Sequence, residues 1–221
     1  MYKTAGGLNV FQGAAQRASN TIRYESPSMT GIKLYGQYSN ATGITGDASK
    51  GDDSKPSSQR DRYAALGATY INGPLRVAVA VDWYLFNDTT KKGYDDNVNY
   101  SIAANYDFGG VKVYGGYKYS KAMRSKVMGA SVERADGQTM MLGISGDVAG
   151  GTVMASAGYA YVDDTVGTTK YELDGWQAAV GYKYPFSKRT TVYSVLSYRD
   201  IDEGSDKTKT TQAMLGLSHK F

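Results

Sequence analysis

The sequence predicts an all-β protein built from antiparallel strands, and two observations favour this fold class. Apolar and polar residues alternate with a period of two along many segments, which is typical of a strand whose two faces meet different surroundings. The connections between these segments alternate between short turns and long polar stretches. Windows with helical spacing are short and rich in Gly, Thr and Tyr, which disfavour helix; one possible exception lies near Phe11–Gln16.

Alternation also defines the individual strands. Between residues 75 and 85 every odd position holds Leu, Val or Trp, whereas Arg76 and Asp82 are among the even positions. Segments 98–106 and 111–119 repeat this pattern. In chain order we expect about eleven strands, at residues 19–25, 30–39, 61–71, 75–85, 97–107, 111–119, 138–148, 152–161, 173–184, 190–199 and 210–221.

The connections divide into two classes. The short ones have the Gly, Pro and Asn content of tight turns and lie at 26–29, 72–74, 108–110, 149–151 and 185–188. The long ones are polar and charged and lie at 40–60, 86–96, 120–137, 162–172 and 200–209. The chain is therefore a series of hairpins that repeats about every forty residues.

Composition excludes several classes of protein. The 221 residues suffice for one domain or one barrel, and the absence of Cys rules out a disulfide framework and a thiolate metal site. The net charge of +4 is scattered along the chain, which argues against a nucleic-acid partner. No stretch approaches the ~18–20 apolar residues of a membrane-spanning helix, but a transmembrane strand needs only ~9–11 residues, half of them polar.

Aromatic residues near the strand ends favour a membrane barrel over a propeller or a sandwich. Outer-membrane barrels combine short periplasmic turns and long outer loops with aromatic girdles at both interfaces. Tyr is also a good strand residue, so its abundance alone has a simpler explanation. The expected girdle residues are Tyr24, Tyr35, Tyr38, Tyr63, Tyr70, Trp83, Tyr84, Tyr106, Tyr117, Tyr119, Tyr159, Tyr161, Trp176, Tyr182, Tyr184 and Tyr198.

The two ends of the sequence indicate that further strands precede it. The first expected strand leads into a short turn and the last follows a long loop, so both run toward the periplasm. A complete barrel has an even number of strands and starts and ends in the periplasm. We therefore expect an odd number of strands before residue 19, or strands from a partner chain. Residues 1–18 also lack the basic start and apolar run of a secretory signal.

Three motifs, in order along the chain, resemble the trimeric, sixteen-stranded general porins of Gram-negative bacteria. The segment 17–27, Arg-Ala-Ser-Asn-Thr-Ile-Arg-Tyr-Glu-Ser-Pro, resembles a strand signature of that family. The segment 184–193, Tyr-Pro-Phe-Ser-Lys-Arg-Thr-Thr-Val-Tyr, resembles one of its turns. The segment 215–221, Leu-Gly-Leu-Ser-His-Lys-Phe, resembles its ending, and the final Phe221 resembles the aromatic that the outer-membrane assembly machinery reads.

This resemblance implies the organisation of the whole chain. Residues 1–18 would be the end of the constriction loop that folds into the pore, and residues 19–221 would be strands six to sixteen of the barrel. The first five strands would be absent from this sequence. The resemblance also implies an outer-membrane location, contact with lipid and lipopolysaccharide, a homotrimer when full length, and no cofactor.

The candidate pore-lining residues follow from strand parity. Arg23 alternates with Ile22 and Tyr24, so it points into the lumen if those two face lipid. In porins that this chain resembles, the arginine of that motif belongs to a basic wall opposite acids of the constriction loop, and charged rings at a constriction set ion preference. The candidates are Arg23, Lys33, Tyr35, Arg76, Lys112, Lys118 and Lys183, with Gln37 and Tyr114 sharing the lining. Their basic excess predicts anion preference.

We therefore expect a passive channel for ions and small hydrophilic solutes, without catalysis. The single His, His219, has no plausible Ser or Cys partner and there is no zinc-ligand spacing, which argues against a barrel enzyme. Acidic doublets at 52–53, 95–96 and 163–164 are candidates for bridging divalent cations to lipopolysaccharide, although solvated loop charge is the simpler explanation. The alternatives are a truncated, non-conducting porin remnant and a soluble all-β binding module.

Overall fold

The computed structural model describes residue 18 and the ranges 20–40, 61–85, 96–127, 130–166, 169–203 and 206–221. Side chains are described throughout these ranges except at 123–135, 164–171 and 203. The possible helix near Phe11–Gln16 and nearly all of the expected constriction-loop segment 1–18 lie outside the described residues.

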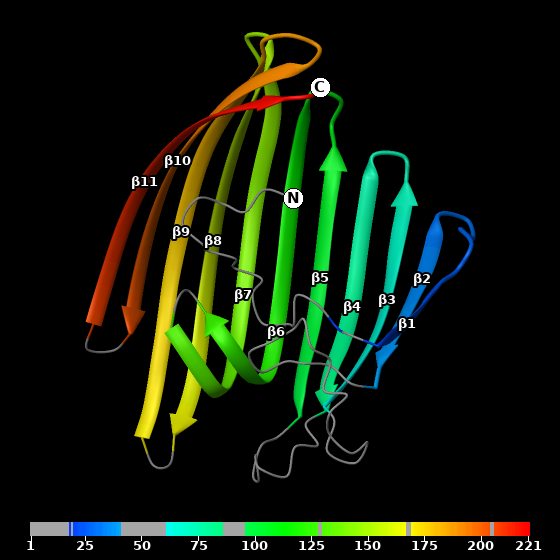
Figure 1. The fold of residues 1–221 in the computed structure, drawn as a ribbon, viewed down its shortest axis with the longest axis vertical. Helices are drawn as coiled ribbons and strands as arrows, with labels where there is room; N and C mark the ends of the chain where they lie inside the picture. The colour runs from blue at the N-terminus through cyan, green and yellow to red at the C-terminus, as the bar shows by residue number, and fades with distance from the viewer. Residues whose placement is uncertain are drawn as a thin grey trace.

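The described chain forms one antiparallel sheet of eleven strands in sequence order, in which each strand pairs with the next (Figure 1). The predicted all-β fold class and strand number are confirmed. No helix within the described ranges is long and apolar enough to cross a membrane. The strands are β1 (Thr21–Glu25), β2 (Ile32–Ser39), β3 (Arg62–Asn72), β4 (Leu75–Leu85), β5 (Asn97–Asp107), β6 (Val111–Val127), β7 (Ala130–Val148), β8 (Gly151–Val166), β9 (Thr169–Pro185), β10 (Thr190–Glu203) and β11 (Asp206–His219).

The pairing register carries the alternation of each strand across the whole sheet. Directly paired residues point to the same face, so one row of side chains crosses successive strands. One such row is apolar or aromatic throughout: Leu34, Ala68, Val79, Ile102, Tyr117, Met140, Tyr159 and Trp176. A row on the other face is polar or small: Arg76, Asn105, Tyr114, Gly143, Ser156, Ala179, Ser197 and Gln212. We call these two surfaces the apolar face and the polar face.

The apolar face is not covered by other parts of the chain. Leu66, Leu142 and Leu215 are 59%, 70% and 79% exposed, which is the reverse of a water-soluble core. A contiguous apolar surface of this extent is costly in water and marks contact with another apolar phase. The sheet is thus built to place this face against hydrocarbon.

Aromatic rings border the apolar face at both ends of the strands. Near the long connections, Trp176 packs on Tyr198 with ring centroids 5.2 Å apart. Near the short turns, Tyr106 packs on Phe108 at 4.5 Å and Tyr182 lies beside Tyr184. Both bands suit a ring that is apolar on its body and polar at its tip.

Three of the sixteen expected girdle residues lie on the other face. The register places Tyr35, Tyr63 and Tyr84 on the polar face, where the Tyr63 and Tyr84 rings pack 4.7 Å apart. A girdle residue must lie near a strand end and also on the apolar face. These three residues meet only the first condition, so the prediction is wrong for them.

The last six strands extend further than predicted on the side of the long connections. The expected loops 120–137, 162–172 and 200–209 are largely paired strand, as in the pairs Asp163–Glu172 and Asp202–Lys207. On the outer face of these extensions stand charged residues such as Asp163, Asp200 and Asp202. The apolar outer face that marks a strand inside the membrane is therefore lost while backbone pairing continues. The loops expected at 40–60 and 86–96 lie almost entirely outside the described residues.

The short turns depend on glycine where the backbone turns left-handed. Ala149 and Gly150 have φ of 51° and 76°, the two positive values that a tight hairpin turn requires. The Tyr182 hydroxyl donates hydrogen bonds to the carbonyls of Val148 and Ala149 at this turn. Gly31 has φ of 85°, and a Cβ there would overlap the carbonyl oxygen of Ile71.

Gly31→Ala is expected to destabilise the folded barrel by about 1–3 kcal/mol, because it adds steric overlap to backbone strain. Gly109→Ala is the matched control, since Gly109 has φ of 92° but no atom lies within 4 Å of the point that its Cβ would occupy. Urea unfolding in detergent, followed by the mobility shift of the folded band, measures both. An equal loss at the two positions would show that the overlap with Ile71 is unimportant.

Candidate functional site: the polar face

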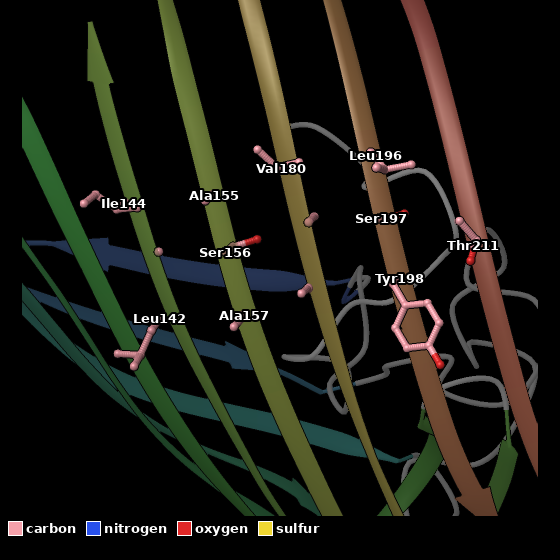
Figure 2. A pocket seen from close by; sticks show the side chains of 13 residues that line it. Leu142, Ile144, Ala155, Ser156, Ala157, Val180, Leu196, Ser197, Tyr198 and Thr211 are labelled. Atoms are coloured by element: carbon pink, nitrogen blue, oxygen red, sulfur yellow. The ribbon is translucent and has the colours of Figure 1, made fainter. Parts of the chain in front are cut away.

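The sheet is curved, and its polar face is on the inside of the curve. Figure 2 looks at the apolar face over β7 to β11, with Leu142, Val180 and Leu196 nearest the viewer. The blue N-terminal strands pass behind them, so the sheet curves round and the polar face lines a trough.

All seven candidate lining residues lie on this polar face, in separate groups along the wall. Arg23, Lys33 and Tyr35 come from β1 and β2. Arg76 and Lys112 lie beside the short turns of β4 and β6. Lys118 lies further along β6, and Lys183 lies on β9. Gln37 and Tyr114 share the same face.

The first group is organised by a carboxylate that the sequence analysis did not select. Glu25 accepts from Lys33, with Nζ 3.0 Å from Oε1, and from Arg23, with Nη2 3.4 Å from Oε2. The Arg23 guanidinium lies 5.8 Å from the centre of the Tyr35 ring. These ion pairs are largely exposed, so they fix side-chain positions more than they stabilise the fold.

The second group repeats this arrangement at the next turns. Lys112 Nζ lies 2.8 Å from Asp107 Oδ2, and Asp107 Oδ1 accepts from the backbone N–H of Gly109 at 3.0 Å. The register puts Asp107 and Lys112 directly opposite one another on β5 and β6. Strand parity alone is enough to place Glu25 and Asp107 on the polar face, since each directly follows a tyrosine of the apolar face, Tyr24 or Tyr106.

Lys118 belongs to a buried polar cluster rather than to the open wall. It is 5% exposed, and Asn99 and Asp82, at 0% and 9%, lie beside it. Asn99 Nδ2 donates to Asp82 Oδ2 at 2.7 Å and to Asn97 Oδ1 at 2.8 Å. The Asp82 carboxylate acts electrostatically on the Lys118 ammonium. Lys118 is therefore withdrawn from the open wall and lies near an opposite charge.

Lys183 lies in a polar hollow of about 740 Å³ at the short-turn end of β7 to β11. The hollow is also lined by Asp147, Thr152, Tyr193 and Lys220. Tyr193 lies flat over Gly216, where a Cβ would overlap its ring, so the glycine lets an aromatic ring line this wall. Lys220 and Tyr193 line this hollow and are not among the residues that the sequence analysis selected.

Basic residues outnumber acidic ones among the described strand side chains of the polar face. The seven basic residues are Arg23, Lys33, Arg76, Lys112, Lys118, Lys183 and Arg199. The five acidic residues are Glu25, Asp82, Asp107, Asp147 and Asp206. The wall therefore carries a modest positive excess.

No catalytic or metal site is apparent within the described residues. None of their His, Asp and Glu side chains gather in groups of three that could hold a metal ion. His219 Nδ1 lies 2.9 Å from the Thr190 hydroxyl, and the His219 ring packs edge-on against Phe221 at 5.0 Å. Phe221 is fully exposed beyond the end of β11.

Asp82→Ala is expected to destabilise the fold by about 2–4 kcal/mol, because it leaves the Lys118 ammonium and an Asn99 N–H donor buried without their carboxylate. Asp107→Ala removes a pair that is about 40% exposed and is expected to leave the stability of the fold nearly unchanged. Urea unfolding in detergent compares the two variants. Similar losses would mean that the burial of the Asp82 cluster carries no energetic weight.

Comparison with known proteins assigns this sheet to a family. The model of the Gram-negative porin family matches residues 1–204. An outer membrane porin protein of Bordetella pertussis is 27% identical over 238 residues, covering 95% of this chain and 60% of that protein. The major outer membrane protein P.IB of Neisseria sicca is 27% identical, covering 91% of this chain and 58% of that protein.

Solved structures with the same fold agree with this assignment. A porin refined at 1.8 Å resolution superposes with a TM-score of 0.60 at 17% identity, covering 91% of this chain and 60% of that porin. OmpT of Vibrio cholerae, folded in vitro, superposes with a TM-score of 0.62 at 16% identity, covering 90% and 63%. The chain spans about 60% of the length of these relatives. It belongs to the Gram-negative porin family, whose members are proteins of the outer membrane.

Proposed function

We propose that the chain forms the larger part of a passive channel for ions and small hydrophilic solutes in the outer membrane. The main observation behind this proposal is the difference between the two faces of the curved sheet. The outer face is apolar and exposed, and the inner face carries charged side chains. A charge on a lipid-facing strand costs ~2–4 kcal/mol at mid-bilayer, whereas a charge beside water costs little. Seven basic and five acidic wall residues thus fit a water-filled lumen.

The same polarity argues against a soluble binding module. Such a protein would keep Leu66, Leu142 and Leu215 away from water, yet these are among its most exposed side chains. The matched family consists of porins, which are channels rather than enzymes.

Closure of the barrel requires strands beyond β1 to β11. In the described sheet β1 and β11 are the two edges, and unpaired backbone groups at an edge are not tolerated in lipid. We propose that five further strands lie between these edges in the complete barrel, as in the sixteen-stranded porins. One related structure is that of a trimer form of Vibrio cholerae OmpT, which supports a homotrimer for the complete protein.

We further propose a preference for anions and assign its basis to the basic excess on the polar face. Arg23, Arg76 and Lys183 contribute to it, whereas Lys118 contributes little because it is buried within the wall near Asp82. We also propose that residues 1–18 end the constriction loop, and that Phe221 is the assembly signal, for which its complete exposure leaves it available.

Lys183→Glu in the purified protein is expected to shift the reversal potential across a salt gradient toward cation preference in planar bilayers. Lys209→Glu is the matched control, since it makes the same charge change on the outer face, where Lys209 lies opposite Asp200. A channel with unchanged selectivity in Lys183→Glu would remove Lys183 from the lining. Absence of any channel activity in the unaltered protein would instead favour the non-conducting remnant.

A further inference from the structure

The polar hollow beside Lys183 is built from the short-turn ends of five strands. In Figure 1 the β7–β8 turn, the β9–β10 turn and the C-terminal end of β11 lie together at the top of the sheet. The pairing register runs one row of polar-face residues through the hollow: Asp147, Thr152, Lys183, Tyr193 and Gly216. The adjacent row, nearer the mouth, consists of Pro185, Thr191 and Ser218. Backbone pairing therefore holds the lining of the hollow in place.

Two ammonium groups line this hollow, those of Lys183 and Lys220. Elsewhere on the polar face, the Nζ atoms of Lys33 and Lys112 lie 3.0 Å and 2.8 Å from a carboxylate oxygen. Among the residues that the structure describes, no ion pair of this kind is found at Lys183 or Lys220. Their charge is therefore available to an anion from solution, whereas the charge of the paired lysines already has a partner.

An aromatic ring lies flat on the wall of the same hollow. Tyr193 on β10 pairs directly with Gly216 on β11. A Cβ at position 216 would overlap the Tyr193 ring, so only glycine lets the ring lie against the backbone. One face of the ring thus covers the wall and the other is turned to the hollow. A ring held in this way offers a rigid apolar surface to a ligand.

Hydroxyl groups and one carboxylate complete the lining. Thr152, Thr191 and Ser218 contribute hydroxyls, each of which can donate and accept a hydrogen bond. Asp147 Oδ1 accepts from the Thr152 hydroxyl at 3.1 Å, and the carboxylate has further lone pairs for a ligand hydroxyl. These groups match a molecule that carries several hydroxyls as well as negative charge.

We propose that this hollow is a binding site for small polyhydroxylated anions of the sugar phosphate class. Lys183 and Lys220 attract the anionic group, one face of the sugar ring packs on Tyr193, and ring hydroxyls bind Asp147. The volume of about 740 Å³ is within the ~300–1,000 Å³ of small-molecule sites. The site deepens the proposed channel function by naming a class of solute, and its place on the passage rests on that function.

Equilibrium dialysis of radiolabelled glucose 6-phosphate against the folded protein in detergent is the direct test, because it does not require conduction. Lys183→Gln and Lys220→Gln are each expected to weaken binding about three- to tenfold, through loss of one charged partner. Lys188→Gln is the matched control, since Lys188 lies on the β9–β10 turn but does not line the hollow, and should leave binding unchanged. The folded state of each variant is checked by its mobility shift on heating.

Two further ligands separate the parts of the site. Glucose lacks the charge and inorganic phosphate lacks the sugar ring, so both should bind more weakly than glucose 6-phosphate. Tyr193→Leu should weaken the binding of glucose 6-phosphate but not that of inorganic phosphate, because it removes the aromatic surface alone. Tyr193→Phe keeps that surface and should restore the binding.

The outcomes distinguish the site from the channel. Unchanged binding in folded Lys183→Gln and Lys220→Gln would overturn the site, as would equal affinity for inorganic phosphate and glucose 6-phosphate. A conducting protein that binds no glucose 6-phosphate would overturn the site and leave the channel function standing. A protein that binds it but forms no channel in planar bilayers would overturn the channel function and leave the site standing.

Discussion

Hydrocarbon provides no hydrogen-bond partner for a backbone N–H or C=O group, and this constraint shapes the whole structure. Each strand from β2 to β10 meets it by pairing on both sides, and the register passes unbroken from strand to strand outside β6 and β7. Because pairing fixes register, the period-two alternation of each strand adds up to two continuous faces. The membrane-facing surface and the wet wall are therefore consequences of one ladder of backbone bonds.

The two faces of the sheet meet different requirements, one set by lipid and the other by water. The apolar face needs no shape complementarity, because fluid lipid adapts to it. Its large apolar side chains are exposed, and aromatic rings border them near both ends of the strands. The polar face has to keep charges in defined positions. It does so through carboxylates such as Glu25 and Asp107 that orient basic partners near the short turns. Among the described basic side chains of the polar face, Lys118 is withdrawn into the wall, beside Asp82 and Asn99.

Much of this architecture could be predicted because alternation is a local signal. The strands at 75–85 and 97–107 have their predicted bounds, since apolar and polar residues alternate strictly to their ends. The extensions of β8 and β10 escape prediction because charged residues, Asp163, Asp200 and Asp202, replace the apolar residues on their outer face. The face of each candidate basic residue follows from parity, but the burial of Lys118 does not, since it depends on neighbouring strands. The left-handed backbone of Ala122 in β6, with φ of 50°, has no signal in the sequence, because alanine has no preference for a positive φ.

The absence of native Cys makes the central claim directly measurable. Ala178 and Ala179 are adjacent on β9 and have similar size and burial, but the register places them on the apolar and polar faces respectively. Single Cys variants at these positions, in the protein reconstituted into lipid vesicles, can be treated with a charged, water-soluble thiol reagent. The account predicts rapid modification of Ala179→Cys and protection of Ala178→Cys. Equal modification of both, or the reverse order, would contradict the assignment of the two faces.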